Sequence, residues 1–143
     1  MTAFASAFGR AAKGGTECWP CLLWLADFVL AETGRDPAAE WRGIEWDEWT
    51  ADRELARLSL TGFGNTLVER ALDAIASREG WIDAEGPQQG ATMVGCYRAN
   101  DPKLGVPAIF DGDQRWLVSY HRNAMLKRET PARVWEIPRL SAA

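Results

Sequence analysis

A nearly continuous apolar run from Cys21 to Ala31, interrupted only by Asp27, constrains the fold of this chain more than any other stretch. Pro20 suits the first turn of a helix, and Gly34 suits the left-handed residue that ends one. A helix that is apolar on almost all sides has to be covered on most of them. The run is shorter than the roughly 20 apolar residues that span a bilayer, so we expect no membrane insertion. The rest of the chain must therefore pack around this helix.

Helical patterns continue along the chain as far as Gly80. Asp36 and Pro37 suit an N-cap and a first-turn proline, which predicts a short helix over residues 38–42. Residues 46–60 predict an exposed helix. Residues 65–80 give the clearest amphipathic pattern, with an apolar stripe formed by Leu67, Val68, Ala71, Leu72 and Ile75.

The hydrophobic period changes after residue 90. Short runs rich in Val, Ile, Trp and Tyr predict strands at residues 91–98, 105–110, 115–120 and 133–138. The sequence Asp-Gly-Asp-Gln between the second and third runs predicts a hairpin. Helices followed by such strands predict an α+β fold, with N-terminal helices packed on a C-terminal antiparallel sheet. We expect a single domain, 1–143, in which residues 1–15 form a flexible or partner-bound arm or a fraying helix.

The composition excludes some classes of function and suggests one kind of surface. The net charge is −4, the pI is about 5.0 and no basic run is present, which argues against nucleic-acid binding. The N-terminal stretch does not have the pattern of a secretory signal, and three Cys, an odd number, fit a reducing compartment. Eight Trp is an unusual number for this length, and Trp is enriched at interfaces. Trp41, Trp46 and Trp49 are therefore predicted to form a partner surface, unless one or two of them close the core.

The segment Cys18–Cys21, Cys-Trp-Pro-Cys, allows three chemical interpretations. A redox pair would be expected in a thioredoxin-like fold, but that fold has a hydrophobic strand directly before the motif, which residues 9–17 cannot form. A Cys₃His zinc site could combine the pair with Cys96 and His121, but these two residues lack a second paired spacing. We therefore expect no metal and no cofactor. The third interpretation is a nucleophilic cysteine at the start of a buried helix.

The stretch LADFVLAETGRDPAAEWRG, residues 25–43, is more specific. It resembles the pattern ADxVLxxTGxDPAAxxRG of a divergent group of phage and prophage proteins related to the NlpC-type, papain-like cysteine peptidases. Cys21, followed by Trp24 and an apolar helix, is similar to the nucleophile region of those peptidases. The later segments PQQGATMVG, PAIFDGDQRWLVS and ARVWEIPRL resemble strands of the same group. The resemblance spans nearly the whole chain and implies a papain-like fold with Cys21 in the nucleophile position.

Three positions depart from the pattern of the active peptidases. Pro20 stands where an Asp commonly precedes the nucleophile. Alignment of the hairpin with the family pattern places Val106 where the catalytic His belongs and Val118 near the third polar residue. Val cannot accept a proton, so the thiol would lack its general base. The only His of the chain, His121, follows about three residues after Val118.

The resemblance and these departures together imply a catalytically inactive protein that is retained for binding. Related proteins are encoded in phage tail modules, so we expect a structural or assembly protein of a phage tail tip. It would contact tail-tip or hub proteins, in several copies, and would be located in the host cytoplasm during assembly and then in the virion. The alternative is a peptidoglycan-cleaving cysteine peptidase that uses Cys21 and His121.

Overall fold

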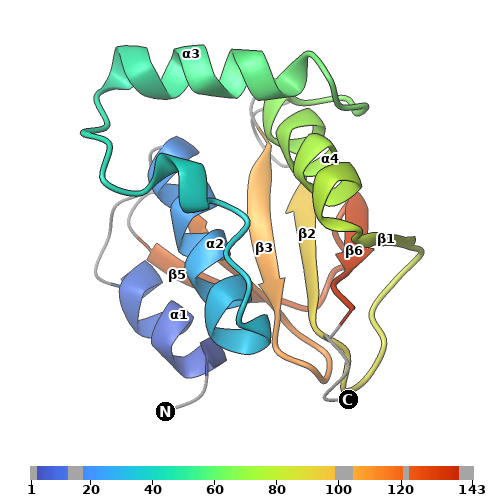
Figure 1. The fold of residues 1–143 in the computed structure, drawn as a ribbon. Helices are drawn as coiled ribbons and strands as arrows, with labels where there is room; N and C mark the ends of the chain where they lie inside the picture. Colours follow the sequence, from blue (N-terminus) through green and yellow to red (C-terminus); the bar gives the residue numbers. More distant parts are fainter. Residues whose placement is uncertain (1–2, 13–17, 99–104, 121–122, 139–143) are drawn as a thin grey trace.

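The computed structural model describes residues 3–12, 18–98, 105–120 and 123–138 (Figure 1). The helical elements come first and are α1 (Ala3–Ala12), α2 (Cys18–Thr33), the 3₁₀ helix η1 (Ala39–Trp41), α3 (Glu48–Ser59) and α4 (Leu67–Glu79). The strands follow and are β1 (Ile82–Ala84), β2 (Met93–Tyr97), β3 (Val106–Phe110), β4 (Trp116–Tyr120), β5 (Asn123–Lys127) and β6 (Arg133–Glu136). Across these ranges, no helix combines the length and the hydrophobicity that crossing a membrane requires.

The strands form one antiparallel sheet in the order β1-β6-β2-β3-β4-β5. β3 and β4 are the predicted hairpin, and the Asp111 carboxylate stabilises its turn by accepting the backbone N–H groups of residues 113, 114 and 115. Figure 1 shows α2 and α4 on the same face of this sheet, and both helices contact β3. The predicted α+β fold, with helices on an antiparallel sheet, is confirmed.

Both faces of the central strands β2 and β3 are buried, whereas the edge strands β1 and β5 carry exposed side chains. Successive residues of β2 and β3 alternate between two apolar clusters. The first cluster lies between the sheet and the helices, and includes Val94, Cys96 and Ile109. The second lies on the opposite face and consists of Met93, Tyr97, Ala108, Phe110, Trp116, Val118 and Val134. Strands that are buried on both faces need apolar residues at successive positions, which explains the short continuous apolar runs of the sequence.

The apolar helix α2 is covered as its sequence required. It begins at Cys18, three residues before the apolar run, and ends before Gly34, whose φ of 79° is left-handed as predicted. Leu25 and Phe28 are buried in the first cluster, and the helix packs against β3.

α1 supplies part of this cover. It packs along α2, and the Trp24 indole N–H donates a hydrogen bond of 2.7 Å to the carbonyl of Ala7. Ala7 itself is fully buried. Of the arm or fraying helix predicted for residues 1–15, Ala3–Ala12 form a helix, and it is docked on α2 because α2 offers it apolar side chains and a hydrogen-bond donor.

Side chains cap the N-terminal ends of α3 and α4. Asp47 accepts the N–H of Thr50 at 2.7 Å, and Thr66 accepts the N–H of Glu69 at 3.1 Å. Gly80 ends α4 with a φ of 76°. β1 and β5 were not predicted, because β1 has three residues and the sequence of β5, Asn-Ala-Met-Leu-Lys, lacks β-branched and aromatic side chains.

Candidate functional site

The predicted catalytic pair falls largely outside the part of the chain that the structure describes. The backbone of Cys21 belongs to the first four residues of α2. The Cys21 side chain and the whole of His121 lie outside the described residues, and so does the side chain of Cys18. The described element before α2 is the helix α1, whereas a thioredoxin-like arrangement needs a strand there.

Val106, the residue that the resemblance places where the catalytic His belongs, does not face α2 in the structure. Val106 packs with the second cluster, on the face of the sheet that lies away from the helices. The β3 residues on the helix side are Pro107 and Ile109, whose partners in β2 are Cys96 and Val94 of the first cluster. Pro and Ile have no group that accepts a proton, so the corrected register also places no general base on β3.

The Val that the resemblance places near the third polar residue also lies on the face away from the helices. Val118 belongs to the second cluster, as its register partner Ala108 does. The neighbouring β4 residue on the helix side is Leu117, which lies in the first cluster. At this position too, β4 offers α2 an apolar side chain.

Cys96 is buried in the first cluster beside the start of α4. Burial, together with the negative charge of Glu69, raises the pKa of its thiol to about 12. A thiol with this pKa stays protonated at neutral pH and is a poor nucleophile and a poor metal ligand. Within the described ranges, no group of three or more His, Cys, Asp or Glu side chains could hold a metal ion.

The three Trp of the predicted partner surface have different environments. Trp41 is only 3% exposed, and its indole N–H donates to Glu54 Oε2 at 3.4 Å. Trp41 therefore cannot belong to an exposed surface, because it is part of the core. Trp46 is half-buried against that core, whereas Trp49 is 67% exposed with the Arg53 guanidinium 4.8 Å from its ring centroid. Of the three, only Trp49 is prominently exposed.

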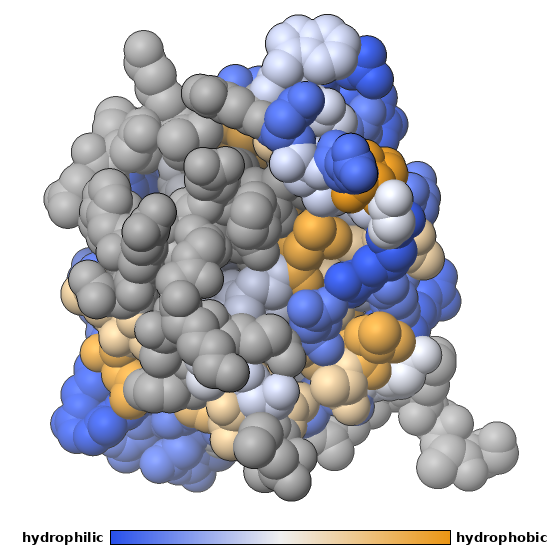
Figure 2. Space-filling model, turned by 90° about the vertical axis from the view of Figure 1, so that its left-hand side faces the viewer, coloured by the Kyte–Doolittle hydropathy of each residue, from blue (hydrophilic) through white to orange (hydrophobic). Residues whose placement is uncertain are grey.

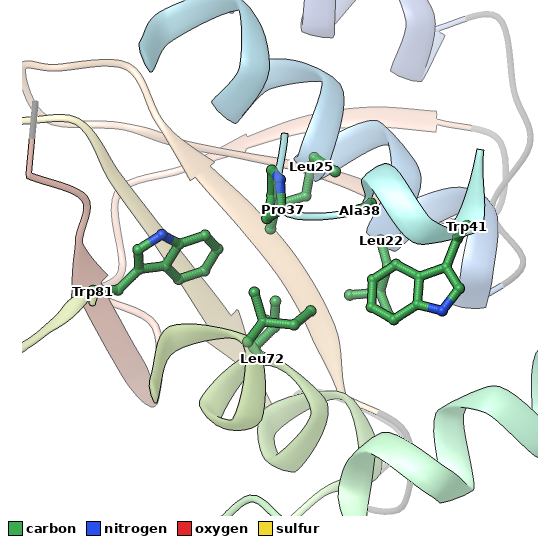
Figure 3. A pocket seen from close by; sticks show the side chains of 9 residues that line it. Leu22, Leu25, Pro37, Ala38, Trp41, Leu72 and Trp81 are labelled. Carbon is green, nitrogen blue, oxygen red and sulfur yellow. The ribbon is translucent and has the colours of Figure 1, made fainter. Parts of the chain in front are cut away.

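Trp41 and Trp81 line a small internal space between α2, η1 and α4 (Figure 3). Its other walls are apolar and include Leu22, Pro37 and Leu72. The space measures about 10 Å³, which is at or below the lower limit of roughly 10–15 Å³ that one water molecule needs. It is therefore a packing gap of the core.

The segment that carries the family resemblance forms a clamp at the end of α2. Asp36 Oδ1 accepts the N–H of Ala38 at 2.9 Å. Arg42 Nε donates to Asp36 Oδ2 at 3.0 Å, and Arg42 Nη1 lies 2.6 Å from Asp27 Oδ1 in α2. Burial by itself would raise the pKa of Asp36, but hydrogen bonds from Arg42 and Ala38 and the charge of Arg42 outweigh it and lower that pKa. Asp27, Asp36 and Arg42 of this segment thus have structural partners in one another.

The loop between α3 and α4 presents an apolar surface that the sequence did not predict. Leu60 and Phe63 are the two most exposed large apolar side chains of the described residues, at 84% and 80%. The signal available in the sequence was a pair of apolar residues inside a turn-forming stretch, Ser-Leu-Thr-Gly-Phe-Gly-Asn-Thr. Figure 2 shows another face of the molecule, on which the coloured hydrophobic residues are interspersed with hydrophilic ones.

A partly buried ion-pair network lies beneath this loop. Glu69 of α4 is 2% exposed and lies 3.1 Å from Arg98, which follows β2. Arg133 of β6 pairs with Asp73 of α4 and lies 3.0 Å from Asp83 of β1. The Arg98 and Asp83 side chains are 44% and 71% exposed, so the buried members are the two carboxylates of α4. Loss of an arginine would leave Glu69 or Asp73 as an uncompensated buried charge, so these pairs link α4 to β2 and β6.

Comparisons of the chain with models of known protein families, with curated proteins and with solved structures find no match. The residues described above and the resemblance seen in the sequence are therefore the basis for a functional proposal. Trp49, Leu60 and Phe63 are the three most exposed large apolar side chains of the described residues.

Proposed function

We propose that this protein is a catalytically inactive, NlpC-like structural or assembly protein of a phage tail tip that acts through protein–protein contacts. The observation that carries the proposal is the chemistry of the strand positions opposite α2. A papain-like peptidase has a His on the sheet that faces the nucleophile helix. Here Pro107, Ile109 and Leu117 occupy the described helix-side positions of β3 and β4.

Acyl transfer by a thiol needs two proton-transfer steps. The thiol has to lose its proton before it attacks, and the leaving amine has to receive one. The N-terminus of α2 can favour a thiolate at Cys21, but a helix terminus cannot deliver a proton. Among the described side chains of β3 and β4 there is no general base, so Cys21 has no described partner for either step. The fold would then be retained because its surface binds other proteins.

Exposed aromatic residues support a binding role. Trp49 near the start of α3 is 67% exposed, and Trp contributes more than most residues to protein interfaces. We propose that it contacts another tail-tip or hub protein, and that the protein is located in the host cytoplasm during assembly and in the virion afterwards.

The hydrolase question is tested with purified peptidoglycan and an active NlpC-type peptidase as positive control. We expect the wild-type chain to release no new amino termini, and Cys21→Ala to fold and assemble as the wild type does. Cleavage that is lost in both Cys21→Ala and His121→Ala would refute the proposal and establish the peptidase alternative.

The location is tested by mass spectrometry of purified virions from the phage or prophage that encodes the chain. We expect its peptides in the tail fraction. A matched pair of variants, Trp49→Ser and Asp52→Asn, both on α3, separates a specific contact from a general surface effect. Trp49→Ser should reduce incorporation into tails while Asp52→Asn should not, and equal incorporation of both would contradict the assigned contact.

A further inference from the structure

The two edges of the sheet differ in how they are protected against pairing with another strand. β1 has only three residues, and its central residue, Asp83, is charged and lies 3.0 Å from Arg133. Short strands and charged side chains are devices that keep an edge from pairing. β5 has five residues, and two of them, Met125 and Leu126, are large apolar side chains that are each 42% exposed. β5 is therefore the less protected edge.

The hydrogen-bond pattern of the sheet shows which backbone groups of β5 point outward. The N–H of Asp111 donates to the carbonyl of Arg115 at 2.9 Å, so these residues are a hydrogen-bonded pair of the β3–β4 hairpin. Such pairs alternate along an antiparallel ladder, which makes Leu117 and its β3 partner the next one. Leu117 thus points its N–H and C=O toward β3, and its β5 partner, Leu126, points its own away from β4. Ala124, two residues earlier in β5, does the same.

These outward groups form a row of backbone donors and acceptors. In the described part of the chain, β4 is the one strand that pairs with β5. α1 contacts β5 from the helix side of the sheet, where Ala124 packs against the first cluster. Lys127, the charged residue of β5, lies 5.1 Å from the ring centroid of Tyr97, on the opposite face. The chemistry that matches such a row is the backbone of another extended strand.

The row is complementary to a second copy of itself. An antiparallel pairing of two β5 strands centred on Met125 places Ala124 of each copy opposite Leu126 of the other. All outward N–H and C=O groups of these two residues are then hydrogen-bonded. A small side chain meets a large one at each of these positions, on the helix side of the sheet. Met125 meets its own counterpart on the opposite face, at a non-hydrogen-bonded position, where side chains lie closest.

We propose that β5 pairs antiparallel with β5 of a second copy of this chain and joins the two sheets into one. Both copies use the same surface, so the contact closes as a dimer with a two-fold axis. It buries the exposed Met125 and Leu126 side chains of both copies together with the backbone hydrogen bonds. The inference extends the proposed function and takes only the biological setting from it. A protein that is absent from virions could still dimerise, and failure to dimerise leaves the virion test unaffected.

The experiment is sedimentation of the wild type and of two charge variants over a concentration series. The wild type should form a dimer and nothing larger. Met125→Lys and Met125→Glu each place two like charges directly opposite each other, so each variant alone should be monomeric. A 1:1 mixture of the two variants should form a heterodimer, because an ammonium group then faces a carboxylate. This rescue requires the register in which residue 125 of one copy faces residue 125 of the other.

A proline substitution tests the backbone contact separately from the side chains. The Leu126 N–H points away from β4, and Pro is tolerated on an edge strand where the N–H faces solvent. Leu126→Pro removes one intermolecular hydrogen bond from each copy, so it should weaken the dimer by about thirtyfold or more. Leu126→Ala also shortens the side chain but keeps the N–H, and should dimerise more strongly than Leu126→Pro. Trp49→Ser, which removes an exposed side chain of α3, should dimerise as the wild type does.

Circular dichroism shows whether each variant is folded. If Leu126→Pro is unfolded, the two Met125 variants still decide the proposal, because their side chains project from the exposed edge of the sheet. A wild type that stays monomeric at millimolar concentration or forms open-ended oligomers would overturn the proposal. So would a mixture of the charge variants that fails to dimerise, or a folded Leu126→Pro that dimerises as the wild type does.

Discussion

Replacement of Asp36 tests whether the segment that resembles the phage group is a structural clamp. Asp36→Ala removes the hydrogen bond to the Ala38 N–H and both contacts with Arg42. Asp36→Asn keeps an oxygen that can cap the turn but removes the charge that Arg42 binds. Arg42 retains its partner Asp27 in both variants, so neither leaves an isolated buried cation.

The magnitude follows from these contacts. The N-cap of η1 is Ala38, so Asp36 closes the turn before η1 instead of capping a helix, and loss of its hydrogen bond with the Ala38 N–H costs about 1 kcal/mol. The Asp36 side chain is 16% exposed and that of Arg42 is 36% exposed, so solvent screens their pair and its loss adds about 1 kcal/mol. Asp36→Ala should therefore lower the free energy of unfolding by about 2 kcal/mol, and Asp36→Asn by about half of that. With roughly 3 °C per kcal/mol for a chain of this size, Tm should fall by about 6 °C and about 3 °C.

Urea denaturation and thermal melts monitored by circular dichroism measure both variants, with Asp52→Asn on the exposed side of α3 as the control. Because the pKa of Asp36 is lowered in the folded state, its stabilisation is present above the unfolded pKa of about 4 and is lost as the pH falls through the folded value. The difference between wild type and Asp36→Asn should shrink toward zero in acid. Equal stability of wild type and Asp36→Ala at pH 7 would refute the clamp.

Two further predictions concern the core and the backbone. Cys96 should not react with a thiol reagent at pH 8 in a folded Cys18→Ser/Cys21→Ser variant, because burial raises its pKa to about 12, and it should react once guanidinium unfolds the chain. Rapid labelling of the folded protein would contradict this. Gly62→Ala should destabilise the protein by about 2 kcal/mol or more, since its Cβ would meet a backbone oxygen at 1.8 Å. Gly9→Ala in α1 should stabilise the protein by about 0.5–1 kcal/mol, because Ala favours a helix and its Cβ would have no atom within 4 Å. Urea titrations measure both changes in the free energy of unfolding, and a change of the opposite sign in either variant would refute its assignment.

The sequence by itself determined the features that depend on neighbours along the chain. Capping by Asp47 and Thr66, the left-handed glycines that end α2 and α4, and the β3–β4 hairpin follow from residues within about four positions of one another. The apolar character of α2 required a covered helix, and the change of hydrophobic period after residue 90 predicted the α+β layout. Of the proposed site, the sequence indicated the Cys21 helix and the exposure of Trp49.

The tertiary structure decided everything that depends on partners distant in the sequence. The face on which Val106 lies is set by its pairing with Tyr97, because a shift of one residue in a strand moves every side chain to the other face. Trp41 is buried and Trp49 exposed although both stand in one polar stretch, since Trp41 packs between α2, η1 and α4 whereas Trp49 projects from α3 into solvent. Phe63 is exposed because Asp73 and Arg133, ten and seventy residues away, hold its backbone and leave its ring no neighbour in the core. Burial is a property of the packed chain, so local patterns cannot specify it.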